Sequence, residues 1–283
     1  MNKKLFLGLV MVPTCLLMVA MVLFVLKNES TGELVELTTA VSADAAQTNG
    51  SYNTTLNTSQ NQVLAATTQP QNNSGLVDAR HRFRAITTSK IFNNELQIYL
   101  SEQSHIENNK IVITADKIGD QYISGKVESK LAFKYGEFVF KINLLKGKGL
   151  FPAIWMLPVD GEMFPEIDIF EQIGSEERKF YGVLHYMKNN KQINQNFNYI
   201  LKKNESTQNI IIDFKWTPTS MIWKINGKVV HKITKDVPKV PAYMIINLAV
   251  GGNWPGDPDK NTKIPATFNV EVLKFAPKEI YPR

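Results

Sequence analysis

The sequence contains almost no cysteine. Cys15 is the only one among its 283 residues. The rest of the chain can therefore form no internal disulfide and offers no thiol nucleophile, so a folded part must depend on its core for stability. Clusters of basic residues are lacking too, because 32 Lys and Arg are spread among 26 Asp and Glu to give a net charge of +6. Nucleic-acid-binding surfaces typically gather Lys and Arg, so we expect no nucleic-acid partner.

Aromatic residues are scarce in residues 28–85, where Tyr52 and Phe83 are the only ones. The same stretch is rich in Ser, Thr, Asn, Gln and Ala. Such a composition cannot bury enough apolar surface to offset the entropy of the chain. The sequence therefore predicts a disordered, flexible linker over residues 28–85.

One long apolar run precedes this linker. Residues 5–26 carry no charge, Lys3 and Lys4 stand before them, and Lys27 follows. A membrane-spanning helix needs about 20 apolar residues, whereas the apolar part of a secretory signal is only about 7–15 residues long. We therefore expect residues 1–27 to form an uncleaved transmembrane signal-anchor, with the amino end in the cytoplasm and the rest of the chain outside. The alternative is a cleaved signal peptide and a secreted protein.

The texture changes at about residue 86, where short stretches rich in Val, Ile, Phe, Tyr and Thr begin to alternate with Gly, Asn, Asp and Pro. No long stretch keeps the 3.6-residue apolar period of a helix. Asn226-Gly227 between two such stretches predicts a tight hairpin turn. Residues 86–283 thus read as one all-β domain, a β-sandwich. The expected strands are residues 96–100, 110–115, 125–133, 137–144, 153–157, 166–173, 180–187, 194–201, 209–216, 220–225, 228–233, 243–250 and 267–275.

Three carboxylates lie close together in residues 165–173, which read PEIDIFEQI. Side chains alternate faces along a regular strand, so Glu166 and Asp168 share one face and Glu171 falls on the other. A β-bulge, one extra residue between Asp168 and Glu171, would bring all three to one surface. Gathering buried like charges is costly, which favours a functional site over a structural strand. Two acids flanking a scissile bond suit glycoside hydrolysis. The alternative is a half-exposed strand with solvated acids.

Seven further segments, taken in order with the acid motif, resemble glycoside hydrolase family 16, and most of all its laminarinase (endo-β-1,3-glucanase) branch. They are residues 93–99 (NNELQIY), 110–115 (KIVITA), 122–126 (YISGK), 134–136 (KYG), 149–157 (GLFPAIWML), 181–186 (YGVLHY) and 247–256 (NLAVGGNWPG). The resemblance implies a concanavalin A-like β-jelly-roll sandwich whose concave sheet forms the substrate cleft. It also implies that Glu166 is the nucleophile, Asp168 its electrostatic partner and Glu171 the general acid/base of a retaining enzyme.

The resemblance suggests four residues that bind substrate. His185 follows the acid motif at the place of a cleft histidine, although a surface or core histidine is the alternative. Trp155 and Trp254 are candidate sugar platforms, because a pyranose presents an apolar face that stacks on an aromatic ring. For Trp155 a plain core role stays open. Asn94 resembles a cleft-edge asparagine, and an ordinary turn residue is the alternative.

Some positions depart from the family pattern. Phe151 stands where the family usually has Trp, and Glu137 and Phe140 stand where it usually has arginines. These changes imply weaker sugar contacts in the donor half of the cleft. The expected first strand is missing upstream of residue 91, which implies a shortened sheet edge. Glu271 lies near the place of a family calcium ligand, so a structural calcium stays open; no other metal and no cofactor is expected.

The resulting hypothesis is a membrane-tethered or exported, monomeric, endo-acting retaining β-glucanase whose partner is a β-glucan polysaccharide such as laminarin. A second reading keeps the mechanism and changes the glycan to another β-glucan or a galactan, or replaces hydrolysis by transglycosylation in wall remodelling. A third is a non-catalytic glucan-binding module of the same fold, which the presence of all three acids disfavours.

Overall fold

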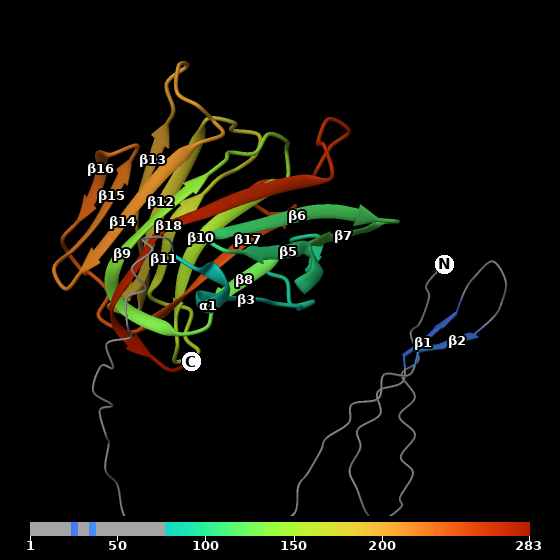
Figure 1. The fold of residues 1–283 in the computed structure, drawn as a ribbon, viewed down its shortest axis with the longest axis horizontal. Helices are drawn as coiled ribbons and strands as arrows, with labels where there is room; N and C mark the ends of the chain where they lie inside the picture. The colour runs from blue at the N-terminus through green and yellow to red at the C-terminus, as the bar shows by residue number, and fades with distance from the viewer. Residues whose placement is uncertain (1–23, 28–33, 38–76) are drawn as a thin grey trace, which may run out of the picture. The chain divides into compact units, whose positions relative to one another are not determined.

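The computed structural model describes residues 24–27, 34–37 and 77–283 (Figure 1). The chain divides into two units, Met1–Gln62 and Val63–Arg283. In the first unit β1 (Phe24–Lys27) pairs antiparallel with β2 (Leu34–Leu37). Residues 24–27 of the expected anchor helix and residues 34–37 of the expected disordered linker are thus strands instead. The rest of residues 1–76 lies outside the described part of the chain. Within the described part of the chain, no helix is both long and apolar enough to cross a membrane.

In residues 77–283, the part of the second unit that the structure describes, the regular elements are almost all strands, as expected. Its helical elements are the short α1 (Ala79–Arg82) and the 3₁₀ turn η1 (Ser101–Gln103). The strands are β3 (Phe83–Ala85), β4 (Gln97–Tyr99), β5 (Ser104–Glu107), β6 (Lys110–Ile118), β7 (Gln121–Ser124), β8 (Lys126–Ser129), β9 (Ala132–Ile142), β10 (Leu150–Pro158), β11 (Glu166–Glu171), β12 (Lys179–Lys188), β13 (Lys191–Ile200), β14 (Ile210–Thr217), β15 (Ser220–Ile225), β16 (Lys228–Ile233), β17 (Ala242–Val250) and β18 (Ala266–Tyr281).

Two antiparallel layers lie face to face (Figure 1). The first, the cleft sheet, has the order β13-β12-β11-β10-β17-β8-β3. The second, the back sheet, has the order β16-β15-β14-β9-β18-β6-β5. They join where Ala242 of β17 pairs with Phe133 of β9, so the two layers form one hydrogen-bonded network. The expected all-β sandwich is confirmed.

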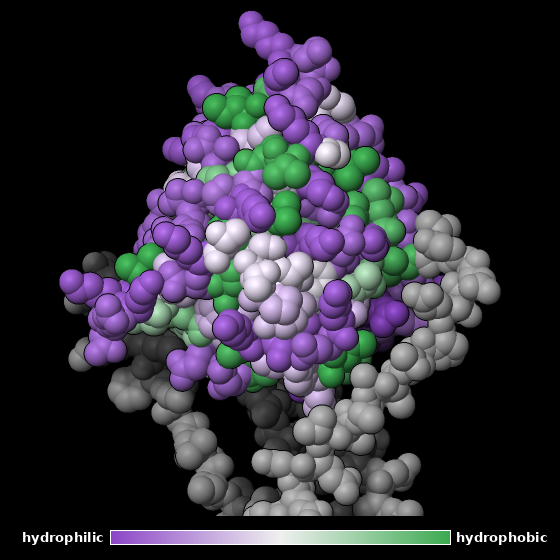
Figure 2. All heavy atoms as spheres, turned by 90° about the vertical axis from the view of Figure 1, so that its left-hand side faces the viewer, coloured by the Kyte–Doolittle hydropathy of each residue, from purple (hydrophilic) through white to green (hydrophobic). Residues whose placement is uncertain are grey.

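The core lies between the two sheets and is rich in aromatic rings. On β14 buried and more exposed residues alternate, as expected of a strand with one face on the core. Phe170 of the cleft sheet stacks on Phe268 of the back sheet, with ring centroids 5.9 Å apart. Trp223 of β15 donates its indole N–H to the carbonyl of Ile169 on β11, at 3.1 Å. Viewed from the side of β14, β15 and β16, the surface is predominantly hydrophilic (Figure 2).

The hairpin turn predicted between β15 and β16 is confirmed. Asn226 and Gly227 both have positive φ, 48° and 80°. That conformation matches the right-handed twist of the flanking strands, and Asn and Gly adopt it with little strain.

The folded unit begins earlier than residue 86, so the predicted linker boundary is wrong. Ala79 and Phe83 are 0% and 1% exposed, and β3 pairs with β8. The sheet edge expected to be shortened is therefore occupied. The ring of Phe83 packs edge-on against Phe275, with centroids 5.4 Å apart. The sequence around Phe83 is polar and basic, and it lacks the alternation of apolar and polar residues that predicts a strand. The strand β3 depends on this one buried aromatic side chain and was therefore not predicted.

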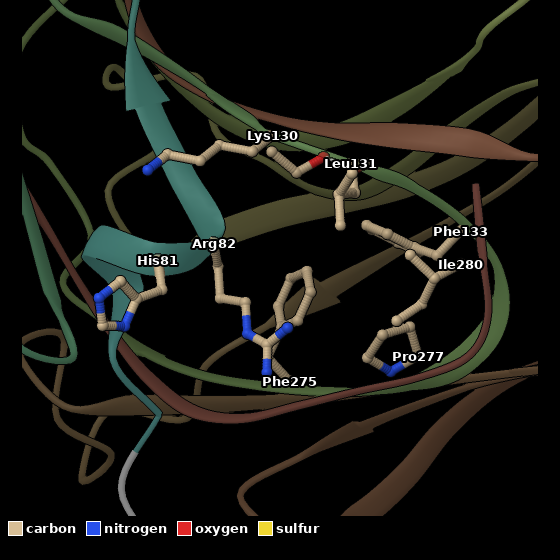
Figure 3. A pocket seen from close by; sticks show the side chains of 9 residues that line it. His81, Arg82, Lys130, Leu131, Phe133, Phe275, Pro277 and Ile280 are labelled. Atoms are coloured by element: carbon tan, nitrogen blue, oxygen red, sulfur yellow. Dashed lines mark hydrogen bonds between the residues drawn. The ribbon is translucent and has the colours of Figure 1, made fainter. Parts of the chain in front are cut away.

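A small pocket lies beside α1 and the end of β18 (Figure 3). His81 and Arg82 border one side and Pro277 and Ile280 the other. Its volume is about 20 Å³, which is room for about one water molecule. The larger hollow of the molecule is on the cleft sheet.

Candidate active site

The predicted bulge lies in β11. Asp168 pairs with Val183 of β12 and Glu171 pairs with Tyr181, so Ile169 and Phe170 together stand opposite the single residue between them. The pairing of β11 with β10 is shifted at the same place. Both bulge residues are buried, at 1% and 0% exposure. The extra residue restores the phase of the strand, so that Glu171 joins the other two acids on the cleft face.

His185 stands directly opposite Glu166 on the neighbouring strand β12. Its Nε2 lies 3.1 Å from Asp168 Oδ2 and 3.8 Å from Glu166 Oε1. Its Nδ1 lies 2.8 Å from Asn194 Oδ1 on β13. The structure thus brings the three predicted acids and the predicted histidine together in one cluster.

The environment raises the pKa of all three carboxyls. Burial raises the pKa of Asp168 well above its usual value, and the charge of Glu166 raises it further. Burial also raises the pKa of Glu171 well above its usual value, with Asp168 and Glu166 adding to the shift. The pKa of Glu166 is raised by burial and lowered by the charge of His185. The charge of His185 lowers the pKa of both glutamates, but only that of Glu171 is still raised well above its usual value. Glu171 is therefore the glutamate better suited to hold a proton, and Glu166 the one better suited to ionise.

A cleft of about 440 Å³ opens above these acids. Its floor comes from β11 and β12, one wall from β13, and the other from two loops around residues 93–95 and 251–255. The lining residues are Asn93, Glu95, Phe151, Glu166, Glu171, Val183, His185, Gln192, Asn194, Asn196, Gly251, Gly252, Asn253, Trp254 and Pro255. Most of them are amides, acids and rings, the groups that bind hydroxyls and sugar faces.

Trp254 lines this cleft, as predicted, and is 47% exposed. Two rings hold it by edge contacts: Phe151 with centroids 5.4 Å apart, and Tyr181 with centroids 4.9 Å apart. The Tyr181 hydroxyl in turn donates to Glu176. Phe151 thus supports the ring of Trp254 from the side of β10.

Trp155 is not among the residues that line this cleft, but it is partly exposed on the face of β10 that carries Phe151. It pairs with Asp168 across β10 and β11. Its indole N–H donates to Asn247 Oδ1 at 2.7 Å, and Asn247 Nδ2 donates to the Tyr99 hydroxyl at 2.9 Å. Trp155 thus lies beside Asp168 on the cleft face of the sheet, and its role as a sugar platform stays a prediction.

Asn94 lies at the cleft edge without lining it. Its Nδ2 donates to Asn253 Oδ1 at 2.8 Å, and the backbone N–H of Asn253 donates to the carbonyl of Asn93. These bonds fasten the two wall loops together. The groups facing the cleft are its neighbours Asn93 and Glu95, which the sequence analysis missed. The positive φ of Asn93 and Asn94, 51° and 58°, produces this turn.

The amides of β13 were not predicted from the sequence as cleft residues. Gln192, Asn194 and Asn196 alternate along the strand and line the cleft. Their spacing of two residues was the available signal, since such residues share one face of a strand.

Glu137 and Phe140 do not bear on the cleft, so the loss of sugar contacts expected from them is wrong. Both lie on β9 in the back sheet. Phe140 is 0% exposed in the core, and Glu137 forms a 2.8 Å ion pair with Lys274.

The residues around Glu271 do not fit a calcium ion. The Lys141 ammonium forms an ion pair with its carboxylate, and Asn109 Nδ2 donates to it at 3.2 Å. The hydrogen bond from Lys141 lowers the pKa of Glu271. Calcium needs about six to eight oxygen ligands, whereas a lysine already neutralises this carboxylate.

Comparison with known proteins agrees with this geometry. The family model described as glycosyl hydrolases family 16 matches residues 92–271. The chain is 30% identical to glucan endo-1,3-beta-glucosidase A1 of Niallia circulans, over 54% of this chain and 26% of that protein. It is also 30% identical to a glucan endo-1,3-beta-glucosidase of Cryptopygus antarcticus, over 64% of this chain and 81% of that protein. The match thus spans about a quarter of the first relative and most of the second.

Solved structures share the fold. The X-ray structure of endo-beta-1,3-glucanase from Pyrococcus furiosus superposes with a TM-score of 0.59 at 30% identity, covering 68% of this chain and 88% of that chain. The laminarinase catalytic domain from Thermotoga maritima gives a TM-score of 0.59 at 29% identity, covering 68% of this chain and 91% of that chain. Because the family model matches more than half of the chain, and the acid cluster lies in the matched part, this protein belongs to family 16 of the glycosyl hydrolases.

Proposed function

We propose that this protein cleaves β-1,3-linked glucan internally and with retention of anomeric configuration. The observation that carries the proposal is the bulge in β11, which places Glu166, Asp168 and Glu171 on one face of a cleft large enough for sugar units. The likeness to laminarinases and endo-β-1,3-glucanases supports the choice of linkage.

The reaction we infer has two displacements. A carboxylate oxygen of Glu166 attacks the anomeric carbon while the Glu171 carboxyl gives its proton to the glycosidic oxygen, and the bond to the leaving sugar breaks. The Glu171 carboxylate then takes a proton from water, the water oxygen bonds to the anomeric carbon, and Glu166 is released. Asp168 and His185 lie next to Glu166, and their charges help to keep Glu166 and Glu171 in different protonation states.

The substrate we infer is an uncharged glycan. No Lys or Arg side chain is among the residues that line the cleft, and Glu95, Glu166 and Glu171 make its lining acidic. A sulfated or carboxylated polysaccharide would meet repulsion there without a cation to pair with. Neutral hydroxyls, by contrast, find amide partners on β13 and a ring face at Trp254.

Two competing functions share this site. Another neutral β-glucan or a galactan would fit the same mechanism, and an acceptor sugar in place of water would give transglycosylation. A binding module without catalysis is disfavoured because the raised pKa of Glu171 serves no purpose in sugar binding.

The test is incubation of the full-length protein in detergent with laminarin, mixed-linkage β-glucan, a soluble cellulose and agarose, followed by sizing of the products. We expect laminarin to give short oligomers early, the sign of internal cleavage. Glu166→Gln should abolish turnover and leave glucan binding intact. Cleavage by Glu166→Gln at the wild-type rate would refute the mechanism, and degradation of another glucan alone would refute the linkage. In a parallel incubation with a short β-1,3-linked oligosaccharide, products longer than the starting oligosaccharide would indicate transglycosylation.

A further inference from the structure

Three hydrogen-bond acceptors converge beside the bulge. The side chain of Asp168 is only 3% exposed, and its Oδ2 atom is nevertheless without a hydrogen-bond partner. His185 Nε2 approaches it to 3.1 Å and Glu166 Oε1 to 3.8 Å. One ligand atom from each of the three residues lies within 4.8 Å of the other two. The unpartnered oxygen of Asp168 therefore lies beside two further atoms, one nitrogen and one oxygen, that could serve with it as metal ligands.

The neighbouring strand sets the direction of the imidazole. His185 Nδ1 lies 2.8 Å from Asn194 Oδ1, and Gln192 Nε2 donates to that same oxygen at 3.3 Å. The donation from Gln192 identifies the Asn194 atom as the carbonyl oxygen, which can only accept. His185 Nδ1 must therefore carry a hydrogen. In the neutral ring, Nε2 then presents its lone pair to the two carboxylates.

These three facing atoms favour a positive charge between them. One imidazole nitrogen and two carboxylate oxygens repel one another unless a proton or a metal ion lies between them. We propose that Glu166, Asp168 and His185 bind one divalent transition-metal ion, with Zn²⁺ preferred, and that this ion blocks the nucleophile. Zinc takes three such protein ligands and keeps a fourth position for water. A metal-binding histidine also usually donates its second N–H to a neighbouring acceptor, as His185 does to Asn194.

The inhibitory consequence rests on the proposed function, whereas metal binding does not. A Glu166 oxygen bound to the ion has no free lone pair directed at an anomeric carbon, so sugar and metal exclude each other. The ion should therefore act as a reversible inhibitor that competes with glucan. Magnesium should not replace it, because Mg²⁺ prefers six oxygen ligands in an octahedron and avoids imidazole.

Isothermal titration of the full-length protein in detergent with ZnCl₂ tests the proposal. The wild type should bind one Zn²⁺ at this site, and His185→Gln should weaken that binding by about 100-fold or more, since a ligand is lost. The matched control is His105→Gln, because His105 is an exposed histidine 3.6 Å from Glu107, away from the cleft. It should leave the titration unchanged. Asn194→Ala should weaken binding by about 10–100-fold while leaving all three ligands in place.

Equal zinc affinity in the wild type and His185→Gln would overturn the proposal, and so would binding of MgCl₂ with the same affinity as ZnCl₂. If His185→Gln does not fold, Asp168→Asn carries the same comparison, with the midpoint of thermal unfolding showing that the fold is intact. Inhibition of laminarin cleavage by ZnCl₂, reversed by EDTA and relieved by excess laminarin, is the expected functional result. Should laminarin prove not to be a substrate, the titrations still decide the metal site.

Discussion

At the scale of a single residue, burial of Glu171 lowers the stability of the fold at high pH and lets the side chain keep a proton for catalysis. Burial and the charges of Asp168 and Glu166 raise its pKa well above the usual 4.5. The folded protein therefore keeps this proton at pH values where the unfolded chain has lost it. The resulting stabilisation is full below the unfolded pKa and is lost as the pH rises through the folded one.

Glu171→Gln should accordingly stabilise the protein at alkaline pH and inactivate it. The amide has the same size and no charge to bury, so the unfolding midpoint should exceed that of the wild type at pH 8. The difference should vanish near pH 4, where both side chains are neutral. In a domain of this size, each ~1 kcal/mol gained in the free energy of unfolding raises the unfolding midpoint by about 2–4 °C. Loss of the proton donor should lower kcat by about 10²–10⁴-fold. Thermal unfolding across this pH range is the measurement; a midpoint below the wild type at pH 8 would contradict it.

Trp254 is the second residue with a separable role. We expect Trp254→Ala to raise KM for glucan by about tenfold, because a stacking contact of about 1.4 kcal/mol is lost. The kcat should change little, since the ring binds the ground state and the transition state alike. Trp254→Phe keeps a ring on the supports from Phe151 and Tyr181 and is the control. An unchanged KM in the alanine variant would remove Trp254 from the binding site.

At the scale of elements, β11 was predictable because its pattern conflicts with a regular strand. Glu166, Asp168 and Glu171 can share a face only with one extra residue between them, and the structure has that residue. Most of the strands predicted from the sequence carry several Val, Ile, Phe, Tyr or Leu residues. The strands β5 and β7, which are four-residue strands with little apolar content, were not predicted. Residues 125–133 were predicted as one strand, where β8 ends and β9 begins.

The walls of the cleft were less predictable than its floor. Loops and the edge strand β13 form the walls. The residues next to the β13 amides do not show whether this face of the strand points into a cleft or into solvent. Glu137 and Phe140 show the same difficulty from the other side: their position in the sequence suggested the cleft, whereas strand pairing places them in the back sheet. Long-range pairing decides such questions, and a single sequence does not contain it.

The short strand β3 provides a test of the corrected domain boundary. Phe83 is 1% exposed and packs against Phe275, so Phe83→Ala should destabilise the fold by about 3–5 kcal/mol. Phe92→Ala is the matched control, because Phe92 is 45% exposed and its loss should change stability by less than about 0.5 kcal/mol. Urea denaturation compares the two. Equal midpoints for both variants would mean that β3 contributes nothing to the folded unit.

At the scale of the whole molecule, we propose that residues 1–27 anchor the enzyme in a membrane and hold its catalytic unit outside the cytoplasm. The basis is the uncharged apolar run of residues 5–26 between Lys4 and Lys27. The full-length protein should then remain with membranes through high salt and alkaline carbonate and leave them only in detergent. Recovery of a soluble protein whose first residue lies near 27 or beyond would show a cleaved signal instead.

We propose that the bulge in β11 brings Glu166 and Glu171 close enough for a covalent, retaining mechanism. An inverting enzyme needs its carboxyls about 6.5–9.5 Å apart to hold the attacking water, whereas a retaining one holds them about 5–5.5 Å apart. The most direct measurement is proton NMR of laminarin during the first minutes of cleavage, before the new reducing ends mutarotate. We expect the β-anomer of the product to appear first. An α-anomer appearing first would contradict both the mechanism and the role of the bulge.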